Sequence, residues 1–213
     1  MADRKYLCID QKSFYATVEC VDRGLDPMTT DLVVADPERS ENTICLAVSP
    51  SLKAKGVSNR CRVKEIPKHL KYITAVPRMQ LYIDCAAAIH GVFLKYIAPE
   101  DIHTYSIDES FLDVTPYLKL YNMTARELAK TIIDDVRETV GTVSTCGIGT
   151  NLYLAKIALD LHAKHAADFI AELDENSYRE KLWDHKPITD FWQIASGKAE
   201  RLRNHGITTM RDI

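Results

Sequence analysis

Three carboxylates in the chain are spaced so that a fold could bring them to one site. Asp10 ends a short apolar run that predicts a buried strand, and Asp108 and Glu109 stand side by side between two further apolar runs, 102–107 and 111–114. Neighbouring residues of a flat strand point to opposite faces, so this pair shares a site only where the chain bends, as at a hairpin tip. An acidic pair there is either a solvated turn or a cation site.

The chemistry that suits three converging carboxylates is metal-assisted phosphoryl transfer. Their negative charges repel one another unless divalent cations neutralise them. Oxygen ligands without Cys or His partners suit Mg²⁺ or Mn²⁺. Two such ions roughly 3.5 to 4 Å apart can activate a hydroxyl and hold both the attacking and the leaving oxygen of a phosphoryl displacement.

The segments around these carboxylates alternate between strand and helix patterns. Thr124, with Glu127 three residues later, predicts a capping box at the start of one helix. The alternation indicates an α+β sheet domain with helices on one face, and near Asp168 it changes to short helices separated by Pro and Gly. The predicted strands are 5–10, 31–36, 43–48, 102–107, 111–114 and 142–148, and the predicted helices are 14–21, 51–55, 79–97, 124–140 and 151–164.

The composition is that of a folded, globular chain. Of 213 residues, 46% are hydrophobic and 27% charged, with only 8 Gly and 8 Pro, which excludes disordered, collagen-like and low-complexity sequence. No apolar run approaches the roughly 20 residues of a membrane helix, and the N-terminus lacks a signal-peptide layout, so we expect a cytoplasmic protein without a membrane partner. Six cysteines without a Cys-x-x-Cys pair predict reduced, buried thiols and no zinc site.

Charge is unevenly distributed along the chain. The net charge of -3 argues against a nucleic-acid partner, because phosphate backbones require Lys and Arg. Residues 37–80, however, contain nine Lys and Arg against three Glu. This basic segment is either a solvated face or a surface that contacts phosphates.

Three stretches of sequence resemble successive motifs of the Y-family translesion DNA polymerases. They are Ile9–Glu19 (IDQKSFYATVE), Tyr105–Asp113 (YSIDESFLD), and Gly147–Asn151 (GIGTN) followed by Leu154–Ala158 (LAKIA). Their order and spacing match as well, and the similarity extends over essentially the whole chain. Among bacterial members, the chain is more similar to the UmuC-like and DNA polymerase IV branch than to others.

The resemblance implies DNA synthesis past damaged bases, in which a nucleotidyl group passes from a deoxynucleoside triphosphate to a primer 3′-hydroxyl. It further implies that Asp10, Asp108 and Glu109, with the backbone carbonyl of Gln11, bind two Mg²⁺ ions, for which Mn²⁺ can substitute. The partners implied are primer-template DNA and the dNTP, with a sliding clamp as a further partner.

Several residues near these motifs are implied to bind the nucleotide. Backbone N–H groups near Ser13 and Phe14 would receive triphosphate oxygens. Tyr15 would lie under the incoming sugar as a steric gate against a 2′-hydroxyl, and Lys156 would contact the triphosphate. The alternatives are that Phe14 and Tyr15 are core aromatics and that Lys156 is a solvated helix lysine.

The sequence departs from the family pattern at two motifs. Lys53 falls where relatives carry a basic phosphate contact, but Pro50 replaces the tyrosine of their Tyr-x-x-Arg stretch, and an ammonium replaces a forked guanidinium. These two replacements predict a lower nucleotide affinity than in such relatives. Where several relatives have a second Asp, this chain has Lys12, but that position varies within the family and does not by itself weaken the metal interpretation.

By the same resemblance the chain divides into an α+β palm with a mainly antiparallel sheet, a small α/β fingers insertion and an all-α partial thumb. The family's C-terminal little-finger domain is absent from these residues. The palm is assigned to 1–22 and 77–166, the fingers to 23–76 and the partial thumb to 167–213.

The thumb contains a helix-hairpin-helix-like pattern in which Ile194 and Lys198 are expected to contact DNA. Relatives have glycines at the places of Gln193 and Ala195, where a backbone N–H approaches a phosphate, so a plain structural helix pair is the alternative. Two other functions stay open: a non-catalytic DNA-binding accessory module that retains a polymerase-like palm, and a nucleotidyl cyclase acting on a free nucleotide.

Overall fold

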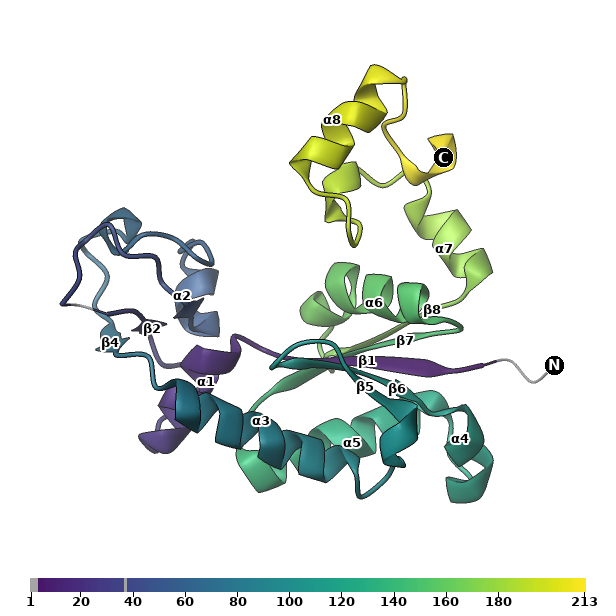
Figure 1. Ribbon diagram of the computed structural model, residues 1–213, viewed down its shortest axis with the longest axis horizontal. Coiled ribbons are helices and arrows are strands. Elements are labelled where there is room, and N and C mark those ends of the chain that lie inside the picture. The colour runs from purple at the N-terminus through teal and green to yellow at the C-terminus, as the bar shows by residue number, and fades with distance from the viewer. Residues whose placement is uncertain (1–3, 37) are drawn as a thin grey trace. The chain divides into compact units, whose positions relative to one another are not determined.

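The computed structural model describes residues 4–36 and 38–213 (Figure 1). Residues 1–3 of the expected palm and Pro37 of the basic segment lie outside the described residues. The strands are β1 (Tyr6–Gln11), β2 (Leu32–Val34), β3 (Ala47–Val48), β4 (Ile73–Ala75), β5 (Ile102–Thr104), β6 (Glu109–Asp113), β7 (Ser144–Gly149) and β8 (Ile170–Leu173). The helices are α1 (Phe14–Asp22), α2 (Pro50–Ala54), α3 (Met79–Phe93), α4 (Thr115–Tyr121), α5 (Ala125–Val140), α6 (Leu152–Leu161), α7 (Glu175–Leu182) and α8 (Ser196–Asn204).

The chain forms two compact units. The first comprises residues 1–10, 96–133 and 145–213, and the second comprises residues 11–95 and 134–144. A sheet anchors each unit in the described part of the chain, with strand order β5-β6-β1-β7-β8 in the first and β3-β2-β4 in the second. The predicted α+β class is confirmed.

The sheet of the first unit is mixed. Strands β5, β6 and β1 are antiparallel neighbours, whereas β7 and β8 run parallel. Consecutive residues of β1, from Leu7 to Ile9, are all at most 1% exposed, so both faces of this sheet are covered. Cys8 packs with Leu159 of α6, and Figure 1 shows α5 on the opposite side of the sheet from α6. The prediction of helices on one face is therefore corrected to two.

Helix α6 lies unusually close to β7. A Cβ atom added to Gly147 would lie 2.1 Å from the carbonyl oxygen of Ala155, and one added to Gly149 would lie 2.2 Å from the Ala155 nitrogen. Any other residue at these two positions would push the helix away from the strand. The glycines therefore fix the distance between β7 and α6, the helix that carries Lys156.

The segment 167–213 is not all-helical as predicted, because Ile170–Leu173 forms β8 and pairs with β7. This pairing satisfies backbone groups that β7 would otherwise leave open at a sheet edge. The sequence FIAEL is short and rich in helix formers, so its pattern did not indicate a strand. Beyond β8, helices α7 and α8 share a hydrophobic cluster with α6 that includes Leu154, Leu182 and Phe191.

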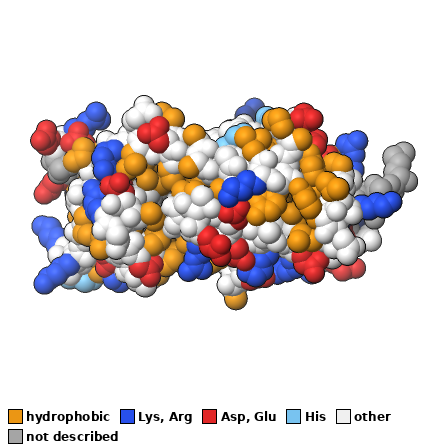
Figure 2. Space-filling view, turned by 90° about the horizontal axis from the view of Figure 1, so that it is seen from below, with side chains coloured by type: hydrophobic (Ala, Val, Ile, Leu, Met, Phe, Trp, Pro, Cys, Tyr) orange, Lys and Arg blue, Asp and Glu red, His pale blue; other side chains and the backbone are white. Residues whose placement is uncertain are grey.

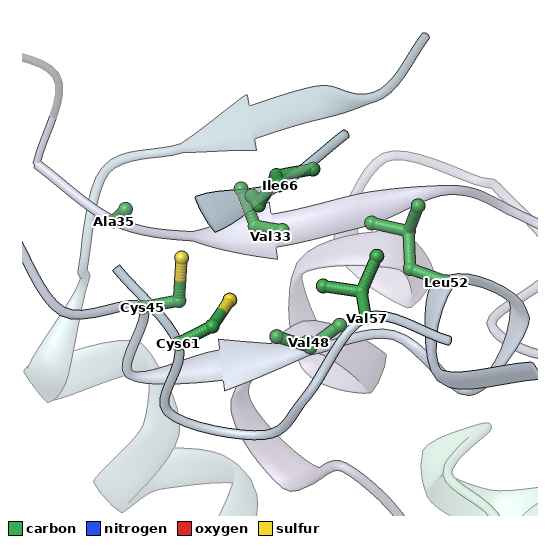
Figure 3. Packing of buried hydrophobic residues seen from close by; sticks show 8 residues of the cluster. All are labelled: Val33, Ala35, Cys45, Val48, Leu52, Val57, Cys61 and Ile66. Atoms are coloured by element: carbon green, nitrogen blue, oxygen red, sulfur yellow. The ribbon is translucent and has the colours of Figure 1, made fainter. Parts of the chain in front are cut away.

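The second unit contains a small α/β assembly with its own core. Helix α2 begins one residue before the predicted start, with the Ser49 side chain accepting a hydrogen bond from the Leu52 N–H, and ends before Gly56, whose φ is 88°. Figure 3 shows how the core side chains of this assembly converge from its strands, α2 and the following loop. They are Val33, Ala35, Cys45, Val48, Leu52, Val57, Cys61 and Ile66.

The cysteines lie mostly in the hydrophobic core. All six cysteines are free and five are buried, Cys85 being half-buried, which agrees with the predicted core positions. Across residues 4–36 and 38–213, no helix combines the length and apolarity needed to cross a bilayer. On the face shown in Figure 2, acidic, basic and hydrophobic side chains are interspersed.

Candidate active site

The first unit carries the three predicted carboxylates at one end of two neighbouring strands of its sheet, β1 and β6. Strands β1 and β6 are antiparallel neighbours in which Asp10 is the Cα partner of Glu109. Asp108 is the residue immediately before β6. Asp10 and Asp108 are half-buried and Glu109 is 7% exposed. The register of β1 and β6 therefore sets the backbones of Asp10 and Glu109 opposite one another.

The hairpin that carries Asp108 turns earlier than predicted. Strands β5 and β6 leave residues 105–108 as the loop, so Glu109 and Ser110 are part of β6 rather than of the tip. The backbone N–H groups of Tyr105 and Ser106 both donate to the Glu109 carbonyl, at 2.9 and 3.0 Å. These two bonds close the loop on Glu109 and produce the bend that places Asp108 and Glu109 together. The Ser106 hydroxyl donates to the Asp108 carboxylate at 2.7 Å.

Both oxygens of Glu109 have partners within the protein. Lys156 Nζ donates to Oε2 at 2.8 Å, and Cys8 Sγ donates to Oε1 at 3.3 Å. The side chains of Lys156 and Glu109 are each 8% exposed, so this is a buried ion pair. The solvated-lysine alternative for Lys156 is thereby excluded.

Asp160 and Lys164, which the sequence analysis did not single out, complete the charge cluster. Lys156 and Lys164 both contact the carboxylate of Asp160, at 3.0 and 2.8 Å, and Lys164 Nζ lies 3.8 Å from Asp10 Oδ2. The spacing 156, 160 and 164 places the three on one side of a helical stretch, which is a signal that the sequence contained. The contact with Asp10 depends on how α6 sits against the sheet and had no such signal.

Burial and the neighbouring charges shift the pKa values of this cluster. Burial raises the pKa of Asp10 to about 6; Lys164 and Lys156 oppose this rise, and Asp108 and Glu109 add to it. Burial alone would lower the pKa of Lys156, but its hydrogen bond to Glu109 and the charge of Asp160 outweigh burial and raise it. The pKa of Lys164 is raised in the same way, against burial, by Asp10 and Asp160. Both lysines are therefore charged at neutral pH.

The donor set at these strand ends suits a hard divalent cation, because its oxygens are carboxylates. The pKa of Asp10 is raised mainly by burial, and the charges of Asp108 and Glu109 add to the rise. Among the residues that the structure describes, no three His, Cys, Asp or Glu side chains converge closely enough to hold a metal. The reason is visible at Glu109 and Asp108, whose oxygens turn to Lys156 and Ser106. Cation binding would require these side chains to rotate.

Apart from Lys156, the candidate nucleotide-binding residues belong to the second unit. Ser13 precedes α1 with φ 52°, and Phe14 is 3% exposed, as the core alternative predicts. Tyr15 is half-buried and stacks on Tyr82, with ring centroids 4.5 Å apart and an interplanar angle of 21°. Lys53 is exposed on α2. The side chain of Gln11 is buried and accepts hydrogen bonds from the hydroxyls of Thr142 and Ser144, at 3.0 Å each.

Of the two candidate DNA-binding residues, Ile194 lies in the turn before α8 and Lys198 lies on α8. Gln193 has φ 67°, the left-handed conformation that explains why relatives use glycine there. The Ile194 N–H donates to the Phe191 carbonyl at 3.0 Å, and its side chain packs on the cluster shared by α6, α7 and α8. Lys198 is exposed. The helix-pair alternative therefore accounts for Ile194, and Lys198 is free of that packing.

Comparison with known proteins gives a consistent result. The model of the impB/mucB/samB family matches residues 9–160. The putative UV-damage repair protein UvrX of Bacillus subtilis (strain 168) is 35% identical over 97% of this chain and 49% of its own length. DNA polymerase IV 2 of the same strain is 32% identical over 99% of this chain and 50% of its own length. The chain thus spans about half the length of these curated relatives.

Solved structures share the fold. The Dbh DNA polymerase in its insertion ternary complex superimposes with a TM-score of 0.81 at 23% identity, covering 98% of this chain and 59% of that chain. DinB from Sulfolobus solfataricus gives a TM-score of 0.77 with the same identity and coverage.

Proposed function

Because this chain belongs to the impB/mucB/samB family, a branch of the Y-family polymerases, we propose that it carries the catalytic part of a translesion DNA polymerase. The reaction is template-directed transfer of a nucleotidyl group from a dNTP to a primer 3′-hydroxyl, in tolerance of DNA damage. The observation that carries the proposal is the pairing of Asp10 with Glu109 across two strands, beside a buried Lys156. Buried charge of this kind is costly to maintain without a task.

In the proposed site Asp10, Asp108 and Glu109, with the carbonyl of Gln11, hold two Mg²⁺ ions. When bound, these ions would lower the pKa of the primer hydroxyl and stabilise charge on the phosphoryl group. Glu109 would exchange its bond to Lys156 for a cation, which frees the Lys156 ammonium for the triphosphate. Lys164 would continue to balance the charge of Asp10.

The remaining roles follow the family resemblance. Backbone N–H groups near Ser13 and Phe14, together with Lys53, would bind triphosphate oxygens, and Tyr15 would exclude a 2′-hydroxyl. The stacking of Tyr15 on Tyr82 supports this role, because a gate needs a fixed ring. Lys198 would contact the DNA backbone.

We assign residues 1–22 and 77–166 to the palm, 23–76 to the fingers and 167–213 to part of the thumb. The core shared by residues 33–66 supports a separate fingers module. Because β8 pairs with β7, one strand of the proposed palm sheet comes from the segment assigned to the thumb. Primer-template DNA and dNTP are the proposed partners. A sliding clamp has no support among the described residues.

The test is primer extension with Mg²⁺ and with Mn²⁺, comparing the parent with Asp108→Asn. We expect the substitution to reduce extension by at least about 10³-fold while the melting temperature changes little, because Asp108 is half-buried and the amide retains its shape. Asp84→Asn, on the exposed surface of α3, is the matched control and should extend normally. Equal activity of Asp108→Asn and Asp84→Asn contradicts the proposal.

Two outcomes would favour the alternatives. Tight duplex binding by a folded parent that extends no primer with either ion points to a DNA-binding accessory module. Two features are compatible with that outcome. The N–H of Ile194 is already bonded to the Phe191 carbonyl, and Pro50 stands where the family pattern has a tyrosine. Pyrophosphate release from a nucleotide in the absence of any DNA points to a cyclase.

A further inference from the structure

A tryptophan of the thumb segment contacts the hairpin that carries the candidate metal ligands. Trp192 follows the 3-10 turn Ile188–Asp190 and precedes α8. Its indole N–H donates to the hydroxyl of Tyr105 at 3.3 Å, and the two rings meet edge to face, with centroids 5.8 Å apart at 77°. Tyr105 is the first residue of the loop 105–108, which joins β5 to β6 and contains Asp108.

The same contact extends to the other end of the loop. Phe111, two residues after Glu109 on β6, lies 5.8 Å from the Tyr105 ring and 6.1 Å from the Trp192 ring. Tyr105 at the start of the loop and Phe111 after its end therefore both contact the ring of Trp192. Phe111 is 3% exposed, whereas Tyr105 is 46% exposed. Besides its contact with Phe111, the Tyr105 ring is held by the ring contact and the hydrogen bond from Trp192.

The restraint passes from Tyr105 to the carboxylates through the backbone. The Tyr105 N–H donates to the Glu109 carbonyl at 2.9 Å, next to the parallel bond from Ser106. Movement of Tyr105 would strain the bond that closes the loop on Glu109, and with it the place of Asp108. Metal ligands need to be held within a fraction of an ångström of their working geometry, which an exposed four-residue loop does not ensure by itself.

We propose that Trp192 is a positioning residue for the metal ligands Asp108 and Glu109, acting through Tyr105. The inference rests on the proposed function and adds to it a link between the thumb turn and the metal site. The turn that presents Trp192 continues into Gln193 and Ile194, so displacement of this turn would be transmitted to the hairpin.

The test compares the two tryptophans of the chain. Trp183, at the end of α7, lies between the guanidinium groups of Arg179 and Arg211, at 5.5 and 5.3 Å, and serves as the matched control. Mn²⁺ binding is measured by electron paramagnetic resonance without DNA or nucleotide. Trp192→Leu is expected to weaken Mn²⁺ binding about threefold to tenfold, as loss of an outer-shell partner does, whereas Trp183→Leu leaves it unchanged.

Two further variants separate positioning from general destabilisation. Tyr105→Phe keeps the ring and removes only a half-exposed hydroxyl, so it folds and should weaken Mn²⁺ binding in the same direction. Because Trp192 acts through Tyr105, adding Trp192→Leu to Tyr105→Phe should cost less than the product of the two separate effects. Trp192→Phe, which keeps a ring but no N–H, should restore part of the affinity.

Kinetics provide a second readout in a parent that extends primers. Trp192→Leu should lower kcat about tenfold and change KM for the dNTP less than about twofold, because Trp192 is not among the proposed nucleotide-binding residues. Unchanged Mn²⁺ affinity in a folded Trp192→Leu, equal effects of Trp183→Leu, or fully multiplicative effects with Tyr105→Phe each overturn the proposal. If Asp108→Asn leaves Mn²⁺ affinity unchanged, the metal site itself is misassigned and the proposed function fails instead.

Discussion

Lys156 shows how one residue can serve two states of a site. In the structure it neutralises the buried carboxylate of Glu109, and its charge is retained because Glu109 and Asp160 raise its pKa despite burial. Removing one partner of a buried ion pair typically costs about 3 to 5 kcal/mol, because the other charge is left unpaired. A cation at Glu109 would take over the task of neutralisation, so Lys156 could turn to a phosphate without leaving a bare carboxylate.

Tyr15 is the residue whose proposed role is most directly measurable. Tyr15→Ala should admit ribonucleotides, lowering the discrimination between dNTP and rNTP, measured as the ratio of kcat/KM values, by at least about 10²-fold. In the proposed role, the ring, which stacks on Tyr82, would fill the space that a 2′-hydroxyl needs. Tyr178→Ala removes a ring of the thumb segment and is the control. Unaltered discrimination in a folded Tyr15→Ala removes Tyr15 from the gate.

The contact between β7 and α6 governs the site at the scale of elements. Helix α6 carries Lys156. The distance between α6 and β7 is set by two glycines of β7, Gly147 and Gly149, whose missing side chains leave room for the helix backbone. The constraint acts between two elements, because the atoms nearest to both glycines' missing side chains belong to the backbone of α6. Both contacts are with backbone atoms, which cannot move aside as the end of a flexible side chain can.

Gly147→Ala is expected to reduce the free energy of unfolding by about 3 kcal/mol or more, since the new methyl group would overlap the Ala155 carbonyl. Chemical denaturation measures this change. Gly197→Ala is the matched control, because nothing lies within 4 Å of its added methyl group on α8, and it should be neutral or stabilising by up to about 1 kcal/mol. Similar losses in both variants would show that the close packing of α6 on β7 has been misjudged.

At the scale of the whole molecule, the sequence predicted what depends on local pattern. Periodicity located β1, α1 and α5 to within one or two residues, and the capping box at Thr124 is present as predicted. The strand β8 was missed because its existence depends on the open edge of β7, which is far away in sequence. The pairing of Lys164 with Asp10 was missed for the same reason, since it follows from how α6 packs rather than from spacing.

Tyr82 is a further case in which tertiary packing decided the outcome. Its place on α3 gave no sign that it would be fully buried, stack on Tyr15 and donate to Glu19 at 2.6 Å. Glu19 is itself fully buried and accepts from Arg78 and Arg23 as well. A buried carboxylate on α1 with three partners could not be anticipated from an apolar helix pattern.

The acid stability of the protein should follow from Glu19. Burial alone would raise its pKa, but the hydrogen bonds from Arg78, Tyr82 and Arg23 outweigh burial and lower it. An acid whose pKa is lower in the folded than in the unfolded chain stabilises the fold above its unfolded pKa of about 4.3, and this stabilisation is lost as the pH falls through the folded value. Asp10 acts in the opposite sense, because its raised pKa of about 6 makes the fold less stable as the pH rises from about 4 to 6.

Glu19→Gln should therefore have a lower melting temperature than the parent at pH 7 and a shallower loss of stability between about pH 4 and 2, as measured by thermal unfolding across that range. The control is Glu127→Gln, because Glu127 also has a lowered pKa but lies exposed at the start of α5, where water screens the interaction and little change is expected. Parallel pH profiles for the parent and Glu19→Gln would assign the acid transition to other carboxylates. If the profile flattens only in Glu19→Gln, this buried network, which joins α1 to α3 through Tyr82 and Arg78, is the main determinant of acid unfolding.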